Sequence, residues 1–368
     1  MALVLAVILV ALVFEFINGF HDTANSIATV VSTKVLTPRQ AILLAASTNL
    51  LGALWGTAVA KTISSGLIDN KLVLMSSDII ICALLGAILW NLITWWSGLP
   101  SSSSHALIGG LCGAALAASG NNWNVIVWAQ PSAQHWWLGK GLLWKVIMPM
   151  ITSPIAGFIL GFIVMALLYL LLRNVRPSKI NRFFGVAQIF SAGAMGLMHG
   201  TNDAQKTMGI IALTLAAATK AGHLQDLPAW LSFLRTPESL SNKDFQIAVW
   251  IKVMCAMTMA GGTAVGGWRI IRTLGHKMVK LHPINGFAAE TSSAAVIAVA
   301  TQLGIPVSTT HNISAAIMGV GTARRVNAIR WTVVERIVWA WIFTIPVSAG
   351  MGYLFVRILR MTGTGANY

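Results

Sequence analysis

The sequence predicts an all-α polytopic membrane protein made of two inverted repeats, each containing a re-entrant helical hairpin. Hydrophobic residues make up 56% of the 368 residues and charged residues only 10%. The mean hydropathy is +0.74, and two short phrases each occur twice within strongly apolar sequence. A soluble globular domain with a charged surface does not reach such values, so the chain is predicted to lie in a lipid bilayer.

Apolar segments of membrane-spanning length recur along the chain, since about 20 residues cross a bilayer. The first segment has neither a basic leader nor a small-residue cleavage site, and is read as a retained helix and not as a signal peptide. The segments are residues 2–20, 41–60, 79–118, 142–172, 184–218, 247–268, 283–320 and 331–356.

Two of these segments are too long for one crossing. Each is broken at its centre by a Gly-Leu/Ile-Pro phrase, Gly98-Leu99-Pro100 in the first and Gly304-Ile305-Pro306 in the second. A helix does not continue smoothly through such a proline. Each segment is therefore either two full spans or a re-entrant hairpin whose tip lies at membrane depth.

The distribution of basic residues chooses between these readings. Lys and Arg cluster in linkers near residues 34–39, 173–182, 269–280 and 324–330, whereas linkers near 69–78, 119–140 and 221–244 are mixed in sign or rich in Trp. The positive-inside rule places the basic group in the cytoplasm. The cytoplasmic and external linkers can all keep their assigned sides only if each long segment returns to the side from which it entered. The two segments are then hairpins of opposite orientation.

The predicted organisation is a pair of inverted repeats, which is characteristic of secondary transporters with a binding site near the bilayer midplane. The first repeat covers residues 1–172, with its hairpin at about 79–118. A basic cytoplasmic linker, residues 173–183, joins it to the second repeat, residues 184–368, with its hairpin at about 283–322.

The net charge of +15 follows from this topology. In a soluble protein it would suggest a nucleic-acid partner, but the basic residues belong to the linkers, so no nucleic acid is expected. Arg357 and Arg360 contradict the positive-inside rule, because this topology places them outside. Pro346 interrupts the segment that contains them, so a different path for the last segment is the alternative. The three cysteines lack paired spacing and are predicted to be packing residues.

Each hairpin phrase continues into a run of hydroxyl side chains and then a histidine. A proline followed by hydroxyls indicates a helix start, where free backbone N–H groups attract an anion. Capping needs one hydroxyl per helix, so the surplus predicts oxyanion binding. The candidate ligands are Ser102, Ser103, Ser104, Ser308, Thr309 and Thr310. For His105 and His311 we favour a tie to a neighbouring helix over contact with the anion.

The second duplicated phrase places a carboxylate beside glycine in the first helix of each repeat. Residues 18–26 contain Asp22, and residues 199–206 contain Asp203, in a chain with only ten acidic residues. A charge within the membrane is costly, so both are candidate cation or proton sites; the alternative is a helix-end carboxylate near the interface. The composition also predicts a locally unwound helix whose carbonyls bind a cation.

Neighbouring residues extend the candidate site. His21 adjoins Asp22, and histidine changes its charge near physiological pH, so it is a candidate for proton coupling or for a structural hydrogen bond. Lys206 either neutralises Asp203 or lies outside the site.

Charge balance predicts cotransport. An anion and the two aspartates cannot share a low-dielectric pocket without compensation, so a cation or proton must accompany the anion. Glu15 and Glu290 are two further carboxylates in apolar sequence, each either a proton-carrying group or a structural hydrogen-bond partner.

The two phrases, each duplicated and in this order, resemble those of the inorganic phosphate transporter (PiT) family. The four motifs are residues 18–26, 98–105, 199–206 and 304–311, and the resemblance covers nearly the whole chain. The stretches around the two aspartates are closest to the bacterial low-affinity branch. The resemblance implies that the hairpins hold phosphate, through the six hydroxyl residues named above. It also implies that the repeat helices hold the coupling cation, at Asp22, Asn25, Asn202 and Asp203.

The resemblance also bears on the coupling ion. Sodium-coupled members typically have Asn where this chain has His21, and an Asn near its Gln205 and Lys206. The bacterial branch is proton-coupled and takes up phosphate as a neutral complex with a divalent metal. We therefore expect H⁺ as the coupling ion, with Na⁺ as the alternative, Mg²⁺ or another divalent cation as a co-substrate, and no cofactor.

The predicted function is a secondary active symporter of inorganic phosphate in a bacterial inner (cell) membrane. The alternatives are a sodium-coupled phosphate symporter, a sulfate or molybdate permease, and an intramembrane hydrolase with Ser103 or Thr309 as nucleophile and His105 or His311 as base. Duplication argues against an enzyme, which rarely needs two inverted nucleophiles. The expected partners are phosphate and the lipid bilayer; the metal ligands and a homodimer are left open.

Overall fold

The computed structural model describes residues 2–69, 71–73, 75–131, 139–222, 224–225, 227–235 and 247–363. Parts of the three linkers predicted to be external, and Met1 and residues 364–368 of the predicted repeats, lie outside these ranges. The described residues form helices, with only isolated bridges of extended chain. The fold is therefore all-α, as predicted.

Twelve α-helices make up the described chain. They are α1 (Ala2–Ser32), α2 (Pro38–Ala53), α3 (Ala58–Ser65), α4 (Ser77–Ser97), α5 (Ser103–Ala118), α6 (Met148–Leu172), α7 (Pro177–Lys220), α8 (Val249–Val265), α9 (Trp268–Arg272), α10 (Pro283–Gln302), α11 (Thr309–Arg324) and α12 (Trp331–Met361). Short 3-10 turns lie at Trp123–Val125, Ala229–Leu234 and Val326–Ala328, and π-helical turns at Leu143–Ile147 and Thr273–Lys277.

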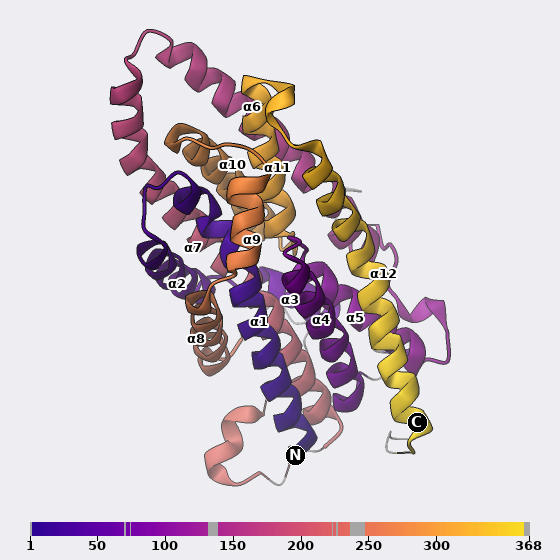
Figure 1. The fold of residues 1–368 in the computed structure, drawn as a ribbon. Coiled ribbons are helices and arrows are strands. Elements are labelled where there is room, and N and C mark those ends of the chain that lie inside the picture. The colour runs from indigo at the N-terminus through magenta and orange to yellow at the C-terminus, as the bar shows by residue number, and fades with distance from the viewer. Residues whose placement is uncertain are drawn as a thin grey trace.

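The order of elements repeats itself with inverted direction. A long helix, a bent pair, a hairpin and a second long helix occur as α1 to α6 and again as α7 to α12. Figure 1 shows α1 running upward from the N-terminus and α7 running downward. In the same view the hairpin α4–α5 opens toward the bottom, and the hairpin α10–α11 toward the top. The two hairpins are therefore re-entrant and of opposite orientation.

Each hairpin turns at the glycine of its phrase. Gly98 has φ 65° and Gly304 has φ 64°, the left-handed conformation that ends helices and that residues with a Cβ adopt at a cost. The next residues close the cap, since Leu99 N donates to Thr94 O over 2.9 Å and Ile305 N donates to Ala300 O over 2.9 Å. The following proline then keeps the chain extended until the second arm begins.

Two predicted membrane segments, residues 41–60 and 247–268, are bent helix pairs and not straight helices. Residues 38–53 and 58–64 are bent by 71°, and residues 249–265 and 268–277 by 58°. A glycine with positive φ lies at each break, Gly56 at 83° and Gly266 at 76°. The hydropathy signal continues across both breaks, so composition alone does not separate the two arms.

The predicted unwinding of the two aspartate phrases is also wrong. Helices α1 and α7 continue without a break through residues 18–26 and 199–206. The glycines serve helix packing instead: a Cβ on Gly19 would collide with the Met259 carbonyl of α8, and one on Gly200 with Asn49 of α2. Close approach of backbones is the usual role of small residues between membrane helices.

The last segment is a single helix, since α12 passes through Pro346 without interruption. The Arg360 guanidinium donates to the carbonyls of Ala117 over 2.9 Å and Ala118 over 2.5 Å at the end of α5. Carbonyls in the last turn of a helix have no partner one turn further on, and the negative end of the helix dipole favours a cation. This contact explains the position of Arg360, one of the two arginines that contradict the predicted topology.

Each hairpin packs against the last helix of the other half of the chain. Helix α5 lies along α12, and α11 lies along α6. Glycines allow the close approach, since a Cβ on Gly113 would collide with the Ala349 carbonyl and one on Gly319 with the Phe158 carbonyl. The three cysteines are buried and free, as expected of packing residues. Two hydrophobic clusters fill the ends of the molecule.

Candidate functional site

Both hairpin tips meet α1 and α7 in a buried polar region inside the molecule. All the residues predicted to hold anion or cation are at most 2% exposed. They are His21, Asp22, Asn25, Ser102, Ser103, Ser104, Asn202, Asp203, Ser308, Thr309 and Thr310. Polar groups with so little access to water require protein or ligand partners.

The tip of the second hairpin joins the two aspartates. Thr310 Oγ1 donates to Asp22 Oδ1 over 3.3 Å, and Thr309 Oγ1 donates to Asp203 Oδ2 over 3.3 Å. The Asn25 amide donates to both hydroxyls, at 3.1 Å for Thr309 and 2.9 Å for Thr310. The predicted anion ligands of this tip therefore lie against the predicted cation ligands of both repeat helices.

On the α1 side, His21 connects Asp22 with the first hairpin. His21 Nδ1 lies 2.7 Å from Asp22 Oδ1, and its Nε2 lies 3.1 Å from Thr94 Oγ1 and 3.4 Å from Ser101 Oγ. The Ser101 hydroxyl donates to Thr94 over 2.8 Å. The sequence had not singled out Thr94 or Ser101; the only signal for Ser101 was that it begins the hydroxyl run.

On the α7 side, Lys206 lies inside the site and pairs with Asp203, which decides between the two readings of this lysine. Its Nζ is 2.5 Å from Asp203 Oδ1. It also donates to Ser104 of the first hairpin and, over 3.1 Å, to the Val307 carbonyl of the second. The ammonium thus joins one repeat helix with both hairpin tips.

A second histidine, outside the predicted set, faces Asp203 from one turn earlier on α7. His199 Nε2 lies 3.4 Å from Asp203 Oδ2, and its Nδ1 lies 3.1 Å from Asn49 Oδ1. Asn49 in turn donates to Thr263 over 3.0 Å. The spacing of four residues on one helix face was the signal that could have found this pair.

Asn202 and Gln205 bind elements around the site and not its centre. The Asn202 amide donates to Thr301 Oγ1 over 2.8 Å and to the Ile305 carbonyl over 3.3 Å, so it fastens α7 to the second hairpin. Gln205 Oε1 accepts from Val59 N over 2.8 Å at the start of α3. Gln205 therefore caps the second arm of the bent pair.

The hydroxyl runs divide between capping and the site. Ser102 accepts from His105 N over 3.2 Å, and Ser308 accepts from His311 N over 3.1 Å, so each helix uses one hydroxyl as its cap. The Ser103 hydroxyl is buried and has no hydrogen-bond partner among the described residues. Three of the surplus hydroxyls thus bind the carboxylates or the ammonium: Thr309 and Thr310 donate to the aspartates, and Ser104 accepts from Lys206.

The two hairpin histidines pack on each other. The ring centroids of His105 and His311 are 4.8 Å apart, edge to face, and His311 stacks on Trp341 of α12 at 4.2 Å. Trp341 Nε1 donates to the Pro100 carbonyl over 3.1 Å. This geometry is that of a tie between both tips and α12.

Two further buried carboxylates lie on either side of the aspartates along α1. Glu15 accepts from Thr207 of α7, and Glu290 of α10 accepts from Thr29 of α1 and Ser191 of α7. Both side chains are fully buried. Both therefore have the hydrogen bonds expected of a structural partner, and these bonds leave a proton-carrying role open.

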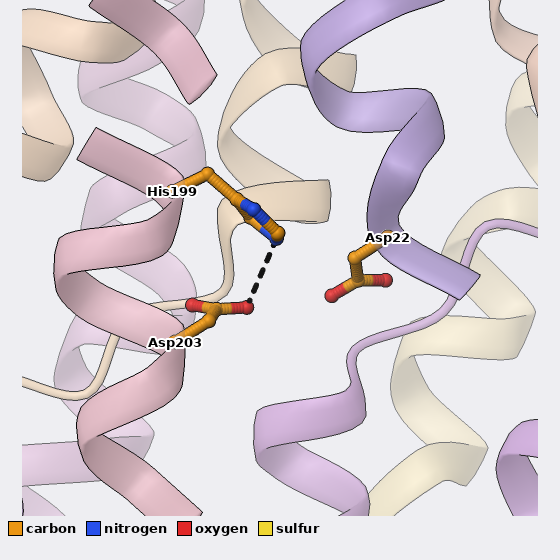
Figure 2. A group of neighbouring side chains, drawn as sticks. All are labelled: Asp22, His199 and Asp203. Carbon is orange, nitrogen blue, oxygen red and sulfur yellow. Dashed lines mark ion pairs between the residues drawn. The ribbon is translucent and has the colours of Figure 1, made fainter. Parts of the chain in front are cut away.

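Asp22, His199 and Asp203 form a cluster that could hold a metal ion. One ligand atom from each lies within 4.8 Å of the others, and all three side chains are buried. Figure 2 shows Asp22 of α1 facing His199 and Asp203 of α7 across the gap between the helices. Two carboxylates and an imidazole suit a divalent cation. No metal ligands were predicted from the sequence.

Comparison with known proteins identifies the family. The phosphate transporter family matches residues 18–352 of the chain. The chain belongs to this family. It is 43% identical to a probable low-affinity inorganic phosphate transporter of Bacillus subtilis, over 98% of both chains. It is 44% identical to a protein of the same description from Rhizobium meliloti, over 94% of this chain and 93% of the relative.

A solved structure shares the fold of this phosphate transporter family member. The sodium-dependent phosphate transporter superposes with a TM-score of 0.78 at 22% sequence identity, covering 98% of this chain and 100% of the other. The family consists of transporters, so the hydrolase alternative is set aside. The apolar helices and bacterial relatives identify an integral protein of the inner membrane.

Proposed function

We propose that the chain is a symporter that carries inorganic phosphate across the membrane, with the hairpin tips holding the anion. One observation carries the proposal: Thr310 and Thr309 of one tip bind Asp22 and Asp203 of the two repeat helices, each over 3.3 Å. Hydroxyls and carboxylates thus converge from both halves of the chain. The relatives named as inorganic phosphate transporters support phosphate as the anion.

We infer that protons drive the transport. The site contains two carboxylates and one ammonium, so an incoming phosphate needs further positive charge in a low-dielectric setting. The pair His21–Asp22, joined over 2.7 Å, is a place for a proton, because an imidazole and a carboxylate can each hold one. Its contact with Thr94 couples that proton to the first hairpin.

A divalent cation fits the same region as part of the cargo. Asp22, His199 and Asp203 would hold a cation such as Mg²⁺ beside the anion, and a neutral metal–phosphate complex would then cross without a net charge. Hairpins that open to opposite ends, each packed on the other half of the chain, suit alternating access.

The experiment is uptake of radiolabelled phosphate by proteoliposomes containing the purified protein, under an imposed pH gradient or an imposed sodium gradient, each with and without Mg²⁺. We expect the pH gradient to drive uptake and Mg²⁺ to increase it. Uptake driven by sodium alone would replace the proton by Na⁺ as coupling ion.

Competition tests the anion. Arsenate has the shape of phosphate and should compete, whereas sulfate should not; the reverse result would indicate a sulfate permease. Asp22→Asn and Asp203→Asn should abolish uptake, and the exposed Glu335→Gln on α12 is the matched control that should retain it. Unchanged uptake in both aspartate variants would contradict the site.

A further inference from the structure

Lys206 and Asn25 occupy matching positions in the two aspartate phrases. In the first, Asp22 is followed three residues later by Asn25; in the second, Asp203 is followed three residues later by Lys206. The two phrases are otherwise built alike, with Gly19 and Gly200 three residues before the aspartate. One repeat therefore presents a neutral amide where the other presents a fixed positive charge.

The Lys206 ammonium is surrounded as a bound cation would be. It is 2% exposed and has three oxygen partners, Asp203 Oδ1 at 2.5 Å, the Val307 carbonyl at 3.1 Å and the Ser104 hydroxyl. An ammonium has three donors, so this set satisfies it. Carboxylate, carbonyl and hydroxyl oxygens are also the ligands that hard cations take from proteins.

The matching position in the first repeat has similar oxygens but no fixed charge. The Asn25 amide nitrogen donates to Thr309 and Thr310, while its Oδ1 is buried without a hydrogen-bond partner among the described residues. Asp22 Oδ1, bound by Thr310, belongs to the same group. An unpartnered buried oxygen beside a carboxylate is a position that a mobile cation or proton would complete.

We propose that Lys206 is a tethered cation that takes the place of one mobile coupling ion and so sets the ion requirement of transport. The inference rests on the proposed phosphate transport. Lys206 supplies positive charge to the second repeat, and the first repeat, at Asp22 and Asn25, remains the position that a mobile ion loads and leaves.

The contacts of Lys206 exceed what a structural ion pair needs. Asp203 also receives the Thr309 hydroxyl at 3.3 Å and lies 3.4 Å from His199, so the lysine is one of three partners of this carboxylate. The other two partners of the ammonium belong to the two hairpin tips, which transport must move. Removing the lysine would leave a buried carboxylate and two oxygens uncompensated, which favours entry of a small cation.

The test is Lys206→Asn, which copies the residue of the first repeat. Phosphate uptake by proteoliposomes is measured under the same pH gradient in sodium, lithium, potassium or choline chloride. Wild-type uptake should be equal in all four salts. The variant should be slow in choline and at least about tenfold faster with sodium or lithium. Lys220→Asn, at the exposed end of the same helix, should behave as the wild type.

Thermal stability tests the same proposal if the Lys206→Asn variant no longer transports phosphate. The Tm of purified Lys206→Asn in detergent should rise with sodium relative to choline at equal ionic strength, and that of the wild type should not. Lys206→Arg keeps the charge and should keep uptake independent of sodium.

Two results would overturn the proposal. One is a folded Lys206→Asn protein whose uptake and Tm do not depend on sodium. Lys206 would then be a phosphate ligand or one half of a structural ion pair with Asp203. The other is a wild type that itself requires sodium. A wild type that transports no phosphate would contradict the proposed function instead, and the Tm comparison would still test the tethered cation.

Discussion

Thr310 donates a hydrogen bond to Asp22 over 3.3 Å although 288 residues separate them in the chain. The contact joins the tip of the second hairpin to the first helix of the first half. Thr309 makes the equivalent contact to Asp203 of α7 over 3.3 Å. Movement of this tip must therefore break or exchange bonds to both aspartates, which links the position of the hairpin to the charge state of the repeat helices.

Neutralising Asp203 should destabilise the protein more than neutralising Asp22. Asp203→Asn leaves the Lys206 ammonium buried without its carboxylate, and breaking a buried ion pair by removing one partner costs about 3–5 kcal/mol. Among the described residues, Asp22 is bound by His21 and Thr310 and by no lysine or arginine. The measurement is thermal unfolding of both variants in detergent.

The double variant Asp203→Asn with Lys206→Met is the control for that comparison. Removing both charges should recover most of the lost stability, because no unpaired ion remains. Equal unfolding temperatures for Asp203→Asn and the double variant would show that the pair is not the cause.

Replacing His21 should weaken phosphate uptake driven by a pH gradient and leave the fold intact. His21→Gln retains a group that can reach Thr94 and Ser101 but lacks the imidazole that lies 2.7 Å from Asp22 Oδ1. Uptake by proteoliposomes under an imposed pH gradient should fall about tenfold or more, because losing a hydrogen bond to a charged group costs about 1.5–3 kcal/mol. His276→Gln, at an exposed histidine outside the site, is the control and should keep the wild-type uptake.

The close packing of the first hairpin on α12 should depend on Gly113, one of several glycines at this contact. A Cβ on Gly113 would collide with the Ala349 carbonyl, whereas nothing lies within 4 Å of a Cβ on Gly185 of α7. Gly113→Ala should therefore lower the Tm, while Gly185→Ala should leave it unchanged or raise it, because alanine favours a helix by about 1 kcal/mol over glycine. Similar shifts for the two variants would contradict this account of the hairpin contact.

The sequence predicted those features whose cause lies within a short stretch of chain. A proline after Gly98 and after Gly304 forces a turn locally, so both hairpins were predictable. The duplicated Asp22 and Asp203 were found because a carboxylate in apolar sequence is costly wherever it lies. The bends near Gly56 were missed because hydropathy does not change across them.

The features that the sequence left open depend on partners distant in the chain. The Lys206 ammonium donates to Ser104, which is 102 residues away, and to the hairpin carbonyl of Val307, and these contacts place it inside the site. The pairing of His21 with Thr94 spans 73 residues. No local pattern distinguishes a lysine that meets such partners from one that lies outside the site, so these assignments required the fold.

Substitution of the two adjacent serines of the first tip, Ser102 and Ser103, should have different effects: one on stability, the other on phosphate binding. Ser102 accepts from His105 N over 3.2 Å and caps α5, so Ser102→Ala should cost about 1 kcal/mol of stability. The Ser103 hydroxyl has no partner within the described part of the chain, so its loss should not affect the fold. A hydrogen bond to a charged group contributes about 1.5–3 kcal/mol, so Ser103→Ala should raise the KM for phosphate about tenfold or more.

Measurements of Tm and of uptake kinetics on both serine variants show which hydroxyl serves the fold and which binds phosphate. The expected pattern is a lower Tm with a similar KM for Ser102→Ala, and an unchanged Tm with a higher KM for Ser103→Ala. If Ser103→Ala lowers Tm and leaves KM unchanged, its hydroxyl serves the fold. The surplus of hydroxyls over the one that capping requires would then no longer support an anion site at this tip.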